Sequence, residues 1–177
     1  KKAWRQPVPS RGGAVRIRVL RQHYCAKCPI VKRSPRSTGV KMLLEATKNP
    51  PKRVLDFGCS NWRNSTYLEK IGAWAVRMDS IPDTKPDVVA YPTHMPFRDR
   101  SFDAVLLTHI LMFLEDKSHW PAALEEATRI ARGYVVVETY RVKHKQSLTY
   151  TDSELIELVS RWRIIRRNVR QDMQNFV

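Results

Sequence analysis

The sequence of 177 residues has few cysteines and no long apolar run. Three cysteines are too few for a disulfide scaffold, which indicates a reduced intracellular protein with a cytoplasmic location. No segment approaches the roughly 18 apolar residues that a membrane-spanning helix needs. The opening residues, KKAWRQPVPSRGG, are not followed by the apolar stretch of a secretory signal. The hydrophobic share of 42% still provides for one domain with a core.

Acidic residues are scarce at the N-terminal end of the chain. Residues 1–53 carry 15 Lys and Arg against one acid, whereas residues 54–155 carry 12 basic and 14 acidic residues. The net charge of +15 therefore indicates a basic arm, placed at 1–35, ahead of a domain at 36–177. Such asymmetry is typical of proteins that bind a polyanion, most often nucleic acid, although a solvated tail would carry the same charge.

Cations and aromatic residues occur together in the arm, where Trp4 and Tyr24 could stack on bases while arginines bind phosphates. The alternative is that the alternating stretch at 15–20 packs on the sheet or covers the cofactor pocket. Arginines between 161 and 170 form a second basic stretch, for which a solvated edge is the alternative. The residues expected to contact nucleic acid are Arg16, Arg18, Arg21, Lys32, Arg33 and Arg36.

A metal site is not expected in the arm. His23, Cys25 and Cys28 offer three ligands, but a structural zinc site needs four, and the chain has no second cysteine pair. We therefore predict no bound metal.

Apolar strands alternate with helical patterns through the rest of the chain. Strands are predicted at 53–58, 73–79, 87–91, 102–109, 134–140 and 163–169, with another from about 173. Helices are predicted to begin after Ser37, Thr66, Ser118 and Thr151, and Gly133 is expected to end the third. This alternation predicts an α/β fold with a doubly wound, mostly parallel sheet. Because residues 80–86 are fewer than the roughly 10 a helical crossover needs, we expect no helix between strands two and three.

The stretch RVLDFGCSNW (53–62) ends a buried strand on an acid and continues with a glycine. Ligands of open parallel sheets bind where strand ends point outward. Gly58 permits a tight turn, and the N–H groups after it suit a carboxylate or phosphate. Asp79 ends the second strand 23 residues after Asp56, where an acid can bind ribose hydroxyls. The pair predicts a nucleoside-bearing cofactor; the alternative is a strand-to-helix turn with a capping acid.

Over about residues 50–170, the chain resembles the class I S-adenosylmethionine-dependent methyltransferases. The resemblance rests on VLDFGCS (54–60), RMDS (77–80), HMPFRDRSFDAVLL (94–107) and ARGYVVVE (131–138), in this order. MPFRDRSFD is similar to the "L-P-F-x-[DP]-x-S-F-D" stretch of the small-molecule-type branch. The resemblance implies a Rossmann-like methyltransferase sheet with an antiparallel C-terminal strand, methyltransferase activity and S-adenosyl-L-methionine as cofactor.

The resemblance also implies roles for individual residues. Asp56 and the turn at Gly58 would hold the methionine end of the cofactor, Asp79 its ribose, and Thr108 would face the transferred methyl. The family has glycine where Ser60 and Trp62 stand, and often an acid where Tyr91 stands. The cofactor-binding residues implied are Asp56, Gly58, Cys59, Ser60, Asp79, Ser80, Ile81, Thr93, His94, Met95 and Thr108.

His109, one residue past Thr108, is the candidate catalytic base, with a structural histidine as the alternative. Methylation of amino groups of adenine or cytosine is not indicated, because no Asp/Asn-Pro-Pro-Tyr/Phe motif follows strand four. Cytosine C5 methylation needs a nucleophilic cysteine, and Cys59 lies inside the cofactor turn. A ribose hydroxyl, another base position, a protein side chain and a small molecule remain.

We therefore expect an S-adenosylmethionine-dependent methyltransferase that acts on nucleic acid recruited by the arm. One alternative is a non-catalytic nucleic-acid-binding protein on a degenerate methyltransferase fold. The other is a methyltransferase for small molecules or proteins.

Overall fold

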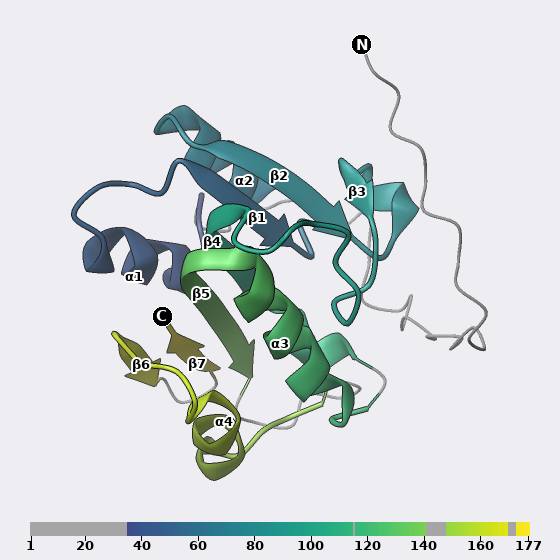
Figure 1. Cartoon of the computed structure of the whole chain (residues 1–177), viewed down its shortest axis with the longest axis vertical. Helices are drawn as coiled ribbons and strands as arrows, with labels where there is room; N and C mark the ends of the chain where they lie inside the picture. The colour runs from purple at the N-terminus through teal and green to yellow at the C-terminus, as the bar shows by residue number, and fades with distance from the viewer. Residues whose placement is uncertain (1–34, 115, 141–147, 170–172) are drawn as a thin grey trace.

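A seven-stranded sheet forms the centre of the molecule, with strand order β3-β2-β1-β4-β5-β7-β6. The structure is a computed structural model, and it describes residues 35–114, 116–140, 148–169 and 173–177. Strands β1 to β5 are parallel, β7 pairs antiparallel with β5, and β6 pairs antiparallel with β7 (Figure 1). The strands are β1 (Arg53–Phe57), β2 (Trp74–Asp79), β3 (Val88–Val89), β4 (Phe102–Thr108), β5 (Ala131–Tyr140), β6 (Arg167–Val169) and β7 (Met173–Phe176).

Helices cover both faces of this sheet, which confirms the predicted doubly wound fold. The helices are α1 (Thr38–Ala46), α2 (Arg63–Lys70), α3 (His119–Ile130) and α4 (Asp152–Val159). The first two pack on one face and the last two on the other (Figure 1). Three of the four predicted helix starts are confirmed, at Ser37, Ser118 and Thr151. None of the helices in the described part of the chain is long and apolar enough to cross a membrane.

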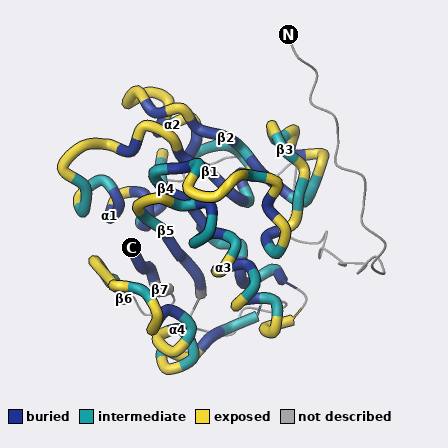
Figure 2. The backbone as a smooth tube through the Cα atoms, viewed as in Figure 1, coloured by how far each residue is buried: buried dark blue, intermediate teal, exposed yellow. Residues whose placement is uncertain are grey.

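Two apolar layers hold the helices to the sheet. Successive strand residues point to opposite faces, so Val54 joins one layer and Leu55 the other. Because both faces are covered, most residues of β1 and β4 are buried, whereas the first residue of β1 is exposed (Figure 2). The layer under α1 and α2 includes Val40, Leu43, Val54, Leu68, Leu106 and Val136. The layer under α3 and α4 includes Leu55, Phe57, Met78, Leu107, Trp120 and Leu155.

The connection between β2 and β3 contains no α-helix, as predicted. A single 3₁₀ turn, Pro82–Thr84, is the regular structure there. β3 has two residues, and its Val89 is 54% exposed. The fold is therefore shortened at this edge.

The predicted start of the second helix is wrong. α2 begins at Arg63, directly after Trp62, and Thr66 lies inside the helix. The spacing of Thr66 and Glu69 matches a capping box, but the same spacing also occurs within a helix. The turn after β1 therefore passes directly into α2, which keeps it short.

The predicted end of the third helix is also wrong. α3 ends at Ile130, and β5 begins at Ala131, so Gly133 lies inside a strand. A side chain at Gly133 would come within 2.7 Å of the backbone oxygen of Asp103 on β4, so close strand approach explains this glycine. The strand predicted at 163–169 is shorter than expected, since only Arg167–Val169 pair with β7.

Candidate active site at the carboxyl ends of the strands

The turn after β1 has the backbone of a glycine-rich loop although it contains one glycine. Gly58, Ser60 and Trp62 have φ angles of 72°, 41° and 62°, which lie in the left-handed region. That region costs a residue with a side chain about 1–2 kcal/mol. At Trp62 the cost is offset, because its indole Nε1 donates to the backbone oxygen of Thr84 at 2.9 Å and Arg77 lies 4.9 Å from its ring centre.

The backbone N–H groups of this turn are bonded within the protein. Those of Gly58 and Cys59 donate to the backbone oxygen of Met78, at 2.7 and 3.2 Å. That of Ser60 donates to Asp79 Oδ2 at 3.1 Å. The expectation that these N–H groups hold a ligand carboxylate is therefore not supported by their hydrogen bonds, which tie β1 to β2 instead.

Asp56 is 1% exposed at the end of β1, and its two carboxylate oxygens differ. Oδ2 accepts hydrogen bonds from Ser65 in the first turn of α2, at 3.0 Å from N and 2.5 Å from Oγ. Oδ1 is buried without a hydrogen-bond partner. Burial raises the pKa of Asp56, and the bonds from Ser65 offset this only in part. A donor from a ligand would satisfy Oδ1.

Asp79 ends the neighbouring strand and is 7% exposed. Its Oδ1 accepts from the N–H of Ile81 at 3.0 Å and its Oδ2 from that of Ser60 at 3.1 Å. Each carboxylate oxygen has about two acceptor positions, so each can accept one further hydrogen bond. Asp79 is thus oriented by the backbone and retains acceptor capacity for a pair of hydroxyls.

The side chain of Ile110 occupies the space beside Gly58. A Cβ built on Gly58 would lie 1.6 Å from Ile110 Cδ1 and 2.3 Å from Cγ1, but 3.7 Å from its Cβ. Only the outer carbons of Ile110 are this close, so rotation about its Cα–Cβ bond would open the space. Ile110 follows β4 and is partly buried. Nothing in the sequence pattern singled it out.

Thr93, His94 and Met95 lie on the loop between β3 and β4. The loop starts close to Asp79, because the N–H of Ala90 donates to the backbone oxygen of Asp79 at 3.1 Å. Thr93 Oγ1 lies 3.0 Å from Nδ1 of the exposed His94. Met95 instead points into the apolar core and is 3% exposed, so its side chain does not line an open rim. These residues are therefore near the end of β2, but they do not form one surface.

Arg129 of α3 holds the following part of this loop. Its guanidinium donates to the backbone oxygens of Met95 and Phe97 at 3.0 and 2.8 Å. It also pairs with Asp99 and with Glu126, each at 2.7 Å. These bonds fix the chain between β3 and β4 against the helix below it.

Polar side chains also meet at the carboxyl ends of β4 and β5. Thr108 ends β4 and is 5% exposed, and its Oγ1 accepts from Asn64 Nδ2 at 3.0 Å. Asn64 Oδ1 in turn accepts from the N–H of Ser37 at 2.8 Å. Asn64 therefore connects the residue predicted to face the transferred methyl with the start of α1.

His109 contacts Glu138, a buried residue near the carboxyl end of β5. His109 Nε2 lies 3.2 Å from Glu138 Oε1, and the N–H of His109 donates to the backbone oxygen of Glu138 at 2.8 Å. His109 has a φ of 61°, which lies in the left-handed region, and these two contacts help to hold it there. Glu138 Oε2 accepts from the N–H of Gly39 at 2.9 Å.

Glu138 is 2% exposed, and it is charged in the folded protein because its partners outweigh its burial. Burial alone would raise the pKa of Glu138, but hydrogen bonds from His109, Gly39 and Ser37 and the charge of His109 hold it below the ordinary value. Sequence reasoning missed this residue. The signal was available, because Glu138 is an acid at the end of an apolar strand, as are Asp56 and Asp79.

Cys59 belongs to the turn after β1 and is 4% exposed. Burial, with the charges of Asp56 and Asp79, raises the pKa of its thiol to about 12. The thiol is therefore protonated at neutral pH and is a poor nucleophile.

Of the six residues predicted to contact nucleic acid, the structure describes Arg36 alone. The guanidinium of Arg36 lies 4.6 Å from the ring centre of Tyr67 on α2, so it helps to fix the chain at the start of α1. Arg16, Arg18, Arg21, Lys32 and Arg33 lie outside the described residues, as do His23, Cys25 and Cys28.

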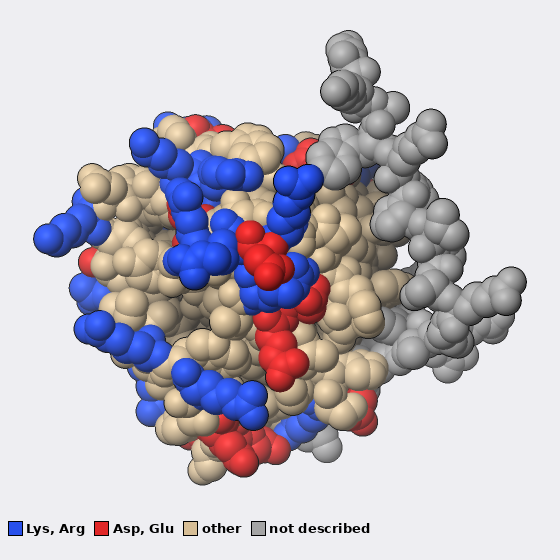
Figure 3. Space-filling view, in the orientation of Figure 1, with Lys and Arg blue, Asp and Glu red and all other residues tan. Residues whose placement is uncertain are grey.

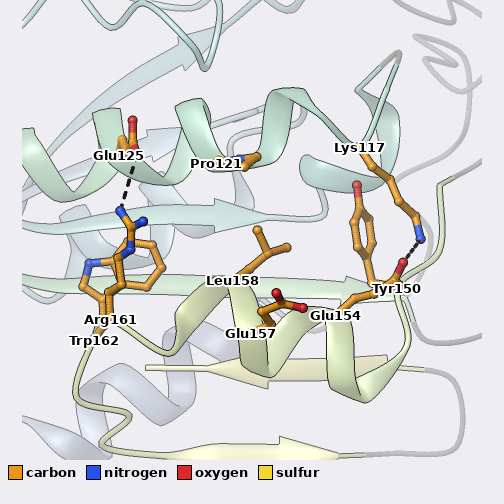
Figure 4. A pocket seen from close by; sticks show the side chains of 9 residues that line it. All are labelled: Lys117, Pro121, Glu125, Tyr150, Glu154, Glu157, Leu158, Arg161 and Trp162. Carbon is orange, nitrogen blue, oxygen red and sulfur yellow. Dashed lines mark hydrogen bonds and ion pairs between the residues drawn. The ribbon is translucent and has the colours of Figure 1, made fainter.

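A groove of about 380 Å³ between α3 and α4 lies on the other face of the sheet from α1 and α2. Ion pairs close both of its ends, from Lys117 to Glu154 at 2.6 Å and from Arg161 to Glu125 at 3.9 Å (Figure 4). Leu158 lies between them. None of the residues at the strand ends described above lines this groove, so it is separate from the candidate site.

Residues 55–137 match the family model of a methyltransferase domain, and they span β1 to β5 with their strand-end residues. This segment is therefore a methyltransferase domain. This confirms the family expected from the motifs. No curated protein matches the sequence.

Solved structures, among them those of methyltransferases, share the fold at low sequence identity. A SAM-dependent methyltransferase from Aquifex aeolicus is 16% identical, with a TM-score of 0.62 over 80% of this chain and 89% of that one. The PH0226 protein of Pyrococcus horikoshii OT3 is 14% identical, with a TM-score of 0.65 over 77% and 84%. The 1,6-didemethyltoxoflavin-N1-methyltransferase of Burkholderia thailandensis is 17% identical, with a TM-score of 0.62 over 78% and 74%. At these identities the likeness concerns the fold.

S-adenosylmethionine, the cofactor of this family, fits the strand-end residues with one adjustment. Asp79 has free acceptor positions for ribose hydroxyls, and Asp56 Oδ1 is a buried acceptor that lacks a donor. The adjustment concerns Ile110, whose outer carbons must leave the space beside Gly58. When bound, the cofactor supplies a methyl group on a positively charged sulfur. We call the carboxyl ends of β1 and β2 the cofactor half of the candidate site and those of β4 and β5 its transfer half, after the roles that the family resemblance implies.

Proposed function

We propose that this methyltransferase acts on nucleic acid, which its basic arm brings to the transfer half of the site. The observation that carries the proposal is the position of the arm's root, defined as residues 35–39. Ser37 bonds to Asn64, which bonds to Thr108, and Gly39 bonds to Glu138 beside His109. The arm therefore joins the domain at the place where a nucleophile would approach the methyl group.

Charge supports the same assignment. Residues 1–34 contain ten Lys and Arg and no acid, whereas residues 54–155 are nearly neutral. On the face shown in Figure 3, Lys and Arg are most numerous toward α1 and α2, and Asp and Glu gather toward α3 and α4. A polyanion would thus be attracted to the side of the molecule that the arm enters.

The chain's residues then have distinct tasks in methyl transfer. Asp79 binds and orients the ribose, and Asp56 accepts a hydrogen bond at the methionine end. His109 lies where it can accept the proton that a hydroxyl or ring N–H nucleophile releases. Because methyl transfer needs an in-line approach above all, orientation of the two substrates accounts for most of the acceleration.

Transfer of tritiated methyl from S-adenosylmethionine to total cellular RNA and to heat-denatured DNA tests the proposal. We expect incorporation into one of them by the full chain. Replacing Arg16, Arg18 and Arg21 by Gln should reduce incorporation and lower the slope of log affinity against log salt by about 2, since each lost phosphate contact removes about 0.7 for single strands. The matched control replaces three exposed cations away from both basic stretches and from α1 and α2, namely Lys85, Arg98 and Arg100.

A small-molecule substrate is the second candidate. It is favoured by the likeness to the Burkholderia thailandensis enzyme, whose structure holds 1,6-didemethyltoxoflavin and S-adenosylhomocysteine. Binding of S-adenosylmethionine without methyl transfer to RNA or DNA, together with equal salt slopes for both triple variants, would favour this candidate.

A further inference from the structure

One carboxylate, that of Glu138, contacts both the candidate base and the root of the arm. Oε1 lies 3.2 Å from His109 Nε2, and Oε2 lies 2.9 Å from the N–H of Gly39. The backbone oxygen of Glu138 accepts from the N–H of His109 at 2.8 Å. Glu138 is paired with Thr108 in the register of β4 and β5, so it lies beside the residue that faces the transfer site.

We propose that Glu138 is a positioning residue for methyl transfer, which holds His109 through one carboxylate oxygen and the root of the arm through the other. The role goes beyond the family resemblance, which includes Glu138 as the last residue of ARGYVVVE (131–138) but implies no task for it. The effect on turnover rests on the proposed function, whereas the effect on the tautomer of His109 does not.

The geometry explains why a carboxylate is needed. His109 and Gly39 each present a donor, so both oxygens of residue 138 must accept. A glutamine has one acceptor oxygen and would place its NH₂ against one of these donors. An aspartate keeps both acceptors but is shorter by one methylene, so it would reach one contact at a time.

The contact from Nε2 to Glu138 selects the tautomer of His109. A proton on Nε2 donates to the carboxylate, which makes Nδ1 the basic nitrogen. In the transfer step the nucleophile's lone pair forms a bond to the methyl carbon while the carbon–sulfur bond breaks. The nucleophile's proton passes to His109, and the sulfur leaves as a neutral thioether.

The second oxygen of Glu138 connects this arrangement to the arm. The N–H of Gly39 lies in the first turn of α1, directly after the residues through which the arm enters. A Cβ at Gly39 would meet Val136 Cγ1 at 2.6 Å and Glu138 Oε2 at 3.1 Å, so α1 approaches β5 closely at this point. A shift of the root would therefore change the position of Glu138 and, through it, of His109.

The test compares Glu138→Gln with Glu138→Asp and with a control, Glu154→Gln. Glu154 forms the capping box of α4 and pairs with Lys117, so its loss also affects stability, far from the transfer half. Nitrogen-15 spectra of the full chain report the tautomer of His109, with His109→Gln to assign its signal among the five histidines. Turnover is measured with tritiated S-adenosylmethionine and whichever of total RNA and heat-denatured DNA accepts methyl from the wild type, and cofactor affinity by calorimetry.

We expect the wild-type spectrum to show the proton on Nε2 of His109, and Glu138→Gln to show a mixture of tautomers. The kcat of Glu138→Gln should fall by about 100-fold while the KM and Kd for S-adenosylmethionine stay within threefold, and Glu138→Asp should recover part of kcat. Glu154→Gln should retain the wild-type spectrum and kcat.

Identical His109 spectra in wild type and Glu138→Gln would overturn the inference, as would a kcat for Glu138→Gln equal to that of the control. If wild type transfers no methyl to RNA or DNA, the proposed function fails by itself. The spectra then still decide the role of Glu138.

Discussion

Asp56 and Glu138 are both buried carboxylates at the ends of parallel strands, yet their surroundings are opposite. Asp56 has one oxygen without a donor, and burial raises its pKa. Glu138 has donors on both oxygens, and despite its burial they lower its pKa. The first residue lies in the cofactor half of the site and the second in the transfer half.

This difference indicates which half the protein completes by itself. In the transfer half, Asn64 is hydrogen-bonded to Ser37 and to Thr108, and Glu138 accepts from Gly39 and contacts His109. In the cofactor half, an acceptor lacks a donor and Ile110 occupies space beside Gly58. We therefore expect a ligand to complete the cofactor half, whereas these side chains of the transfer half already bond within the protein.

The largest effect is expected at Asp79, where a substitution should weaken binding of S-adenosylmethionine in the cofactor half. Asp79→Asn removes the charge that would accept two ribose hydroxyls, at about 1.5–3 kcal/mol for each hydrogen bond to a charged group. Calorimetry should show affinity for S-adenosylmethionine falling by about 100-fold or more. Asp83→Asn, an exposed acid four residues on, is the control and should bind normally. Equal losses in both variants would remove Asp79 from the site.

Glu138→Ala should lower the free energy of unfolding of the protein by about 2–3 kcal/mol, because it leaves the buried N–H of Gly39 without an acceptor. Urea unfolding at several pH values measures this loss. Since the pKa of Glu138 is lowered in the folded state, its contribution is present above the ordinary value of 4.5 and disappears as pH falls below it. The difference between wild type and variant should therefore become smaller in acid, and a constant difference would contradict the lowered pKa of Glu138.

Ile110→Ala tests whether the cofactor half is filled in the absence of ligand. The smaller side chain leaves the space beside Gly58 open, so S-adenosylmethionine no longer displaces buried carbons. We expect its affinity to rise by about 10-fold, which corresponds to about 1.4 kcal/mol. Ile156→Ala, at a 41% exposed residue of α4, is the control. Unchanged or weaker binding would show that Ile110 is not an obstacle.

Asp56→Asn should stabilise the protein while it weakens cofactor binding. Ionised Asp56 is destabilising because its folded pKa is raised, so the gain should appear as pH rises above the ordinary value of 3.8. We expect about 1 kcal/mol in urea unfolding at pH 7. This sign is the opposite of that for Glu138→Ala. A loss of stability at pH 7 would mean that Oδ1 is satisfied in the folded protein.

The smallest effect is expected at Ser60, whose φ of 41° suits glycine. Ser60→Gly should raise the unfolding free energy by up to about 1 kcal/mol, whereas Ser60→Ala should not. Trp62→Gly should be destabilising despite a similar φ, because it loses the bond to Thr84 and the contact with Arg77. Thermal melts of the three variants measure the ranking, and a gain at Trp62 would contradict it.

The sequence predicted the sheet and the cofactor half better than the transfer half. Apolar runs predict buried parallel strands, and Asp56 and Asp79 can be recognised because each lies at the end of such a run. The transfer half depends on contacts between distant segments, from Ser37 to Asn64 and from Gly39 to Glu138, which no local pattern encodes. Of these residues, only Glu138 could have been predicted from the sequence, because it is an acid near the end of an apolar strand, as Asp56 and Asp79 are. Ile110 was not, because its position depends on the turn around Gly58.

The two outer strands of the sheet have a consequence for behaviour in solution. β3 offers two residues, and β6 offers three, beginning with Arg167. An unpaired outer strand can recruit another chain and begin aggregation, and short or charged strands limit this. Loss of the helix beside β3 therefore exposes little backbone for such pairing. Because both outermost strands are short, the sheet presents little unpaired backbone to which another chain could pair.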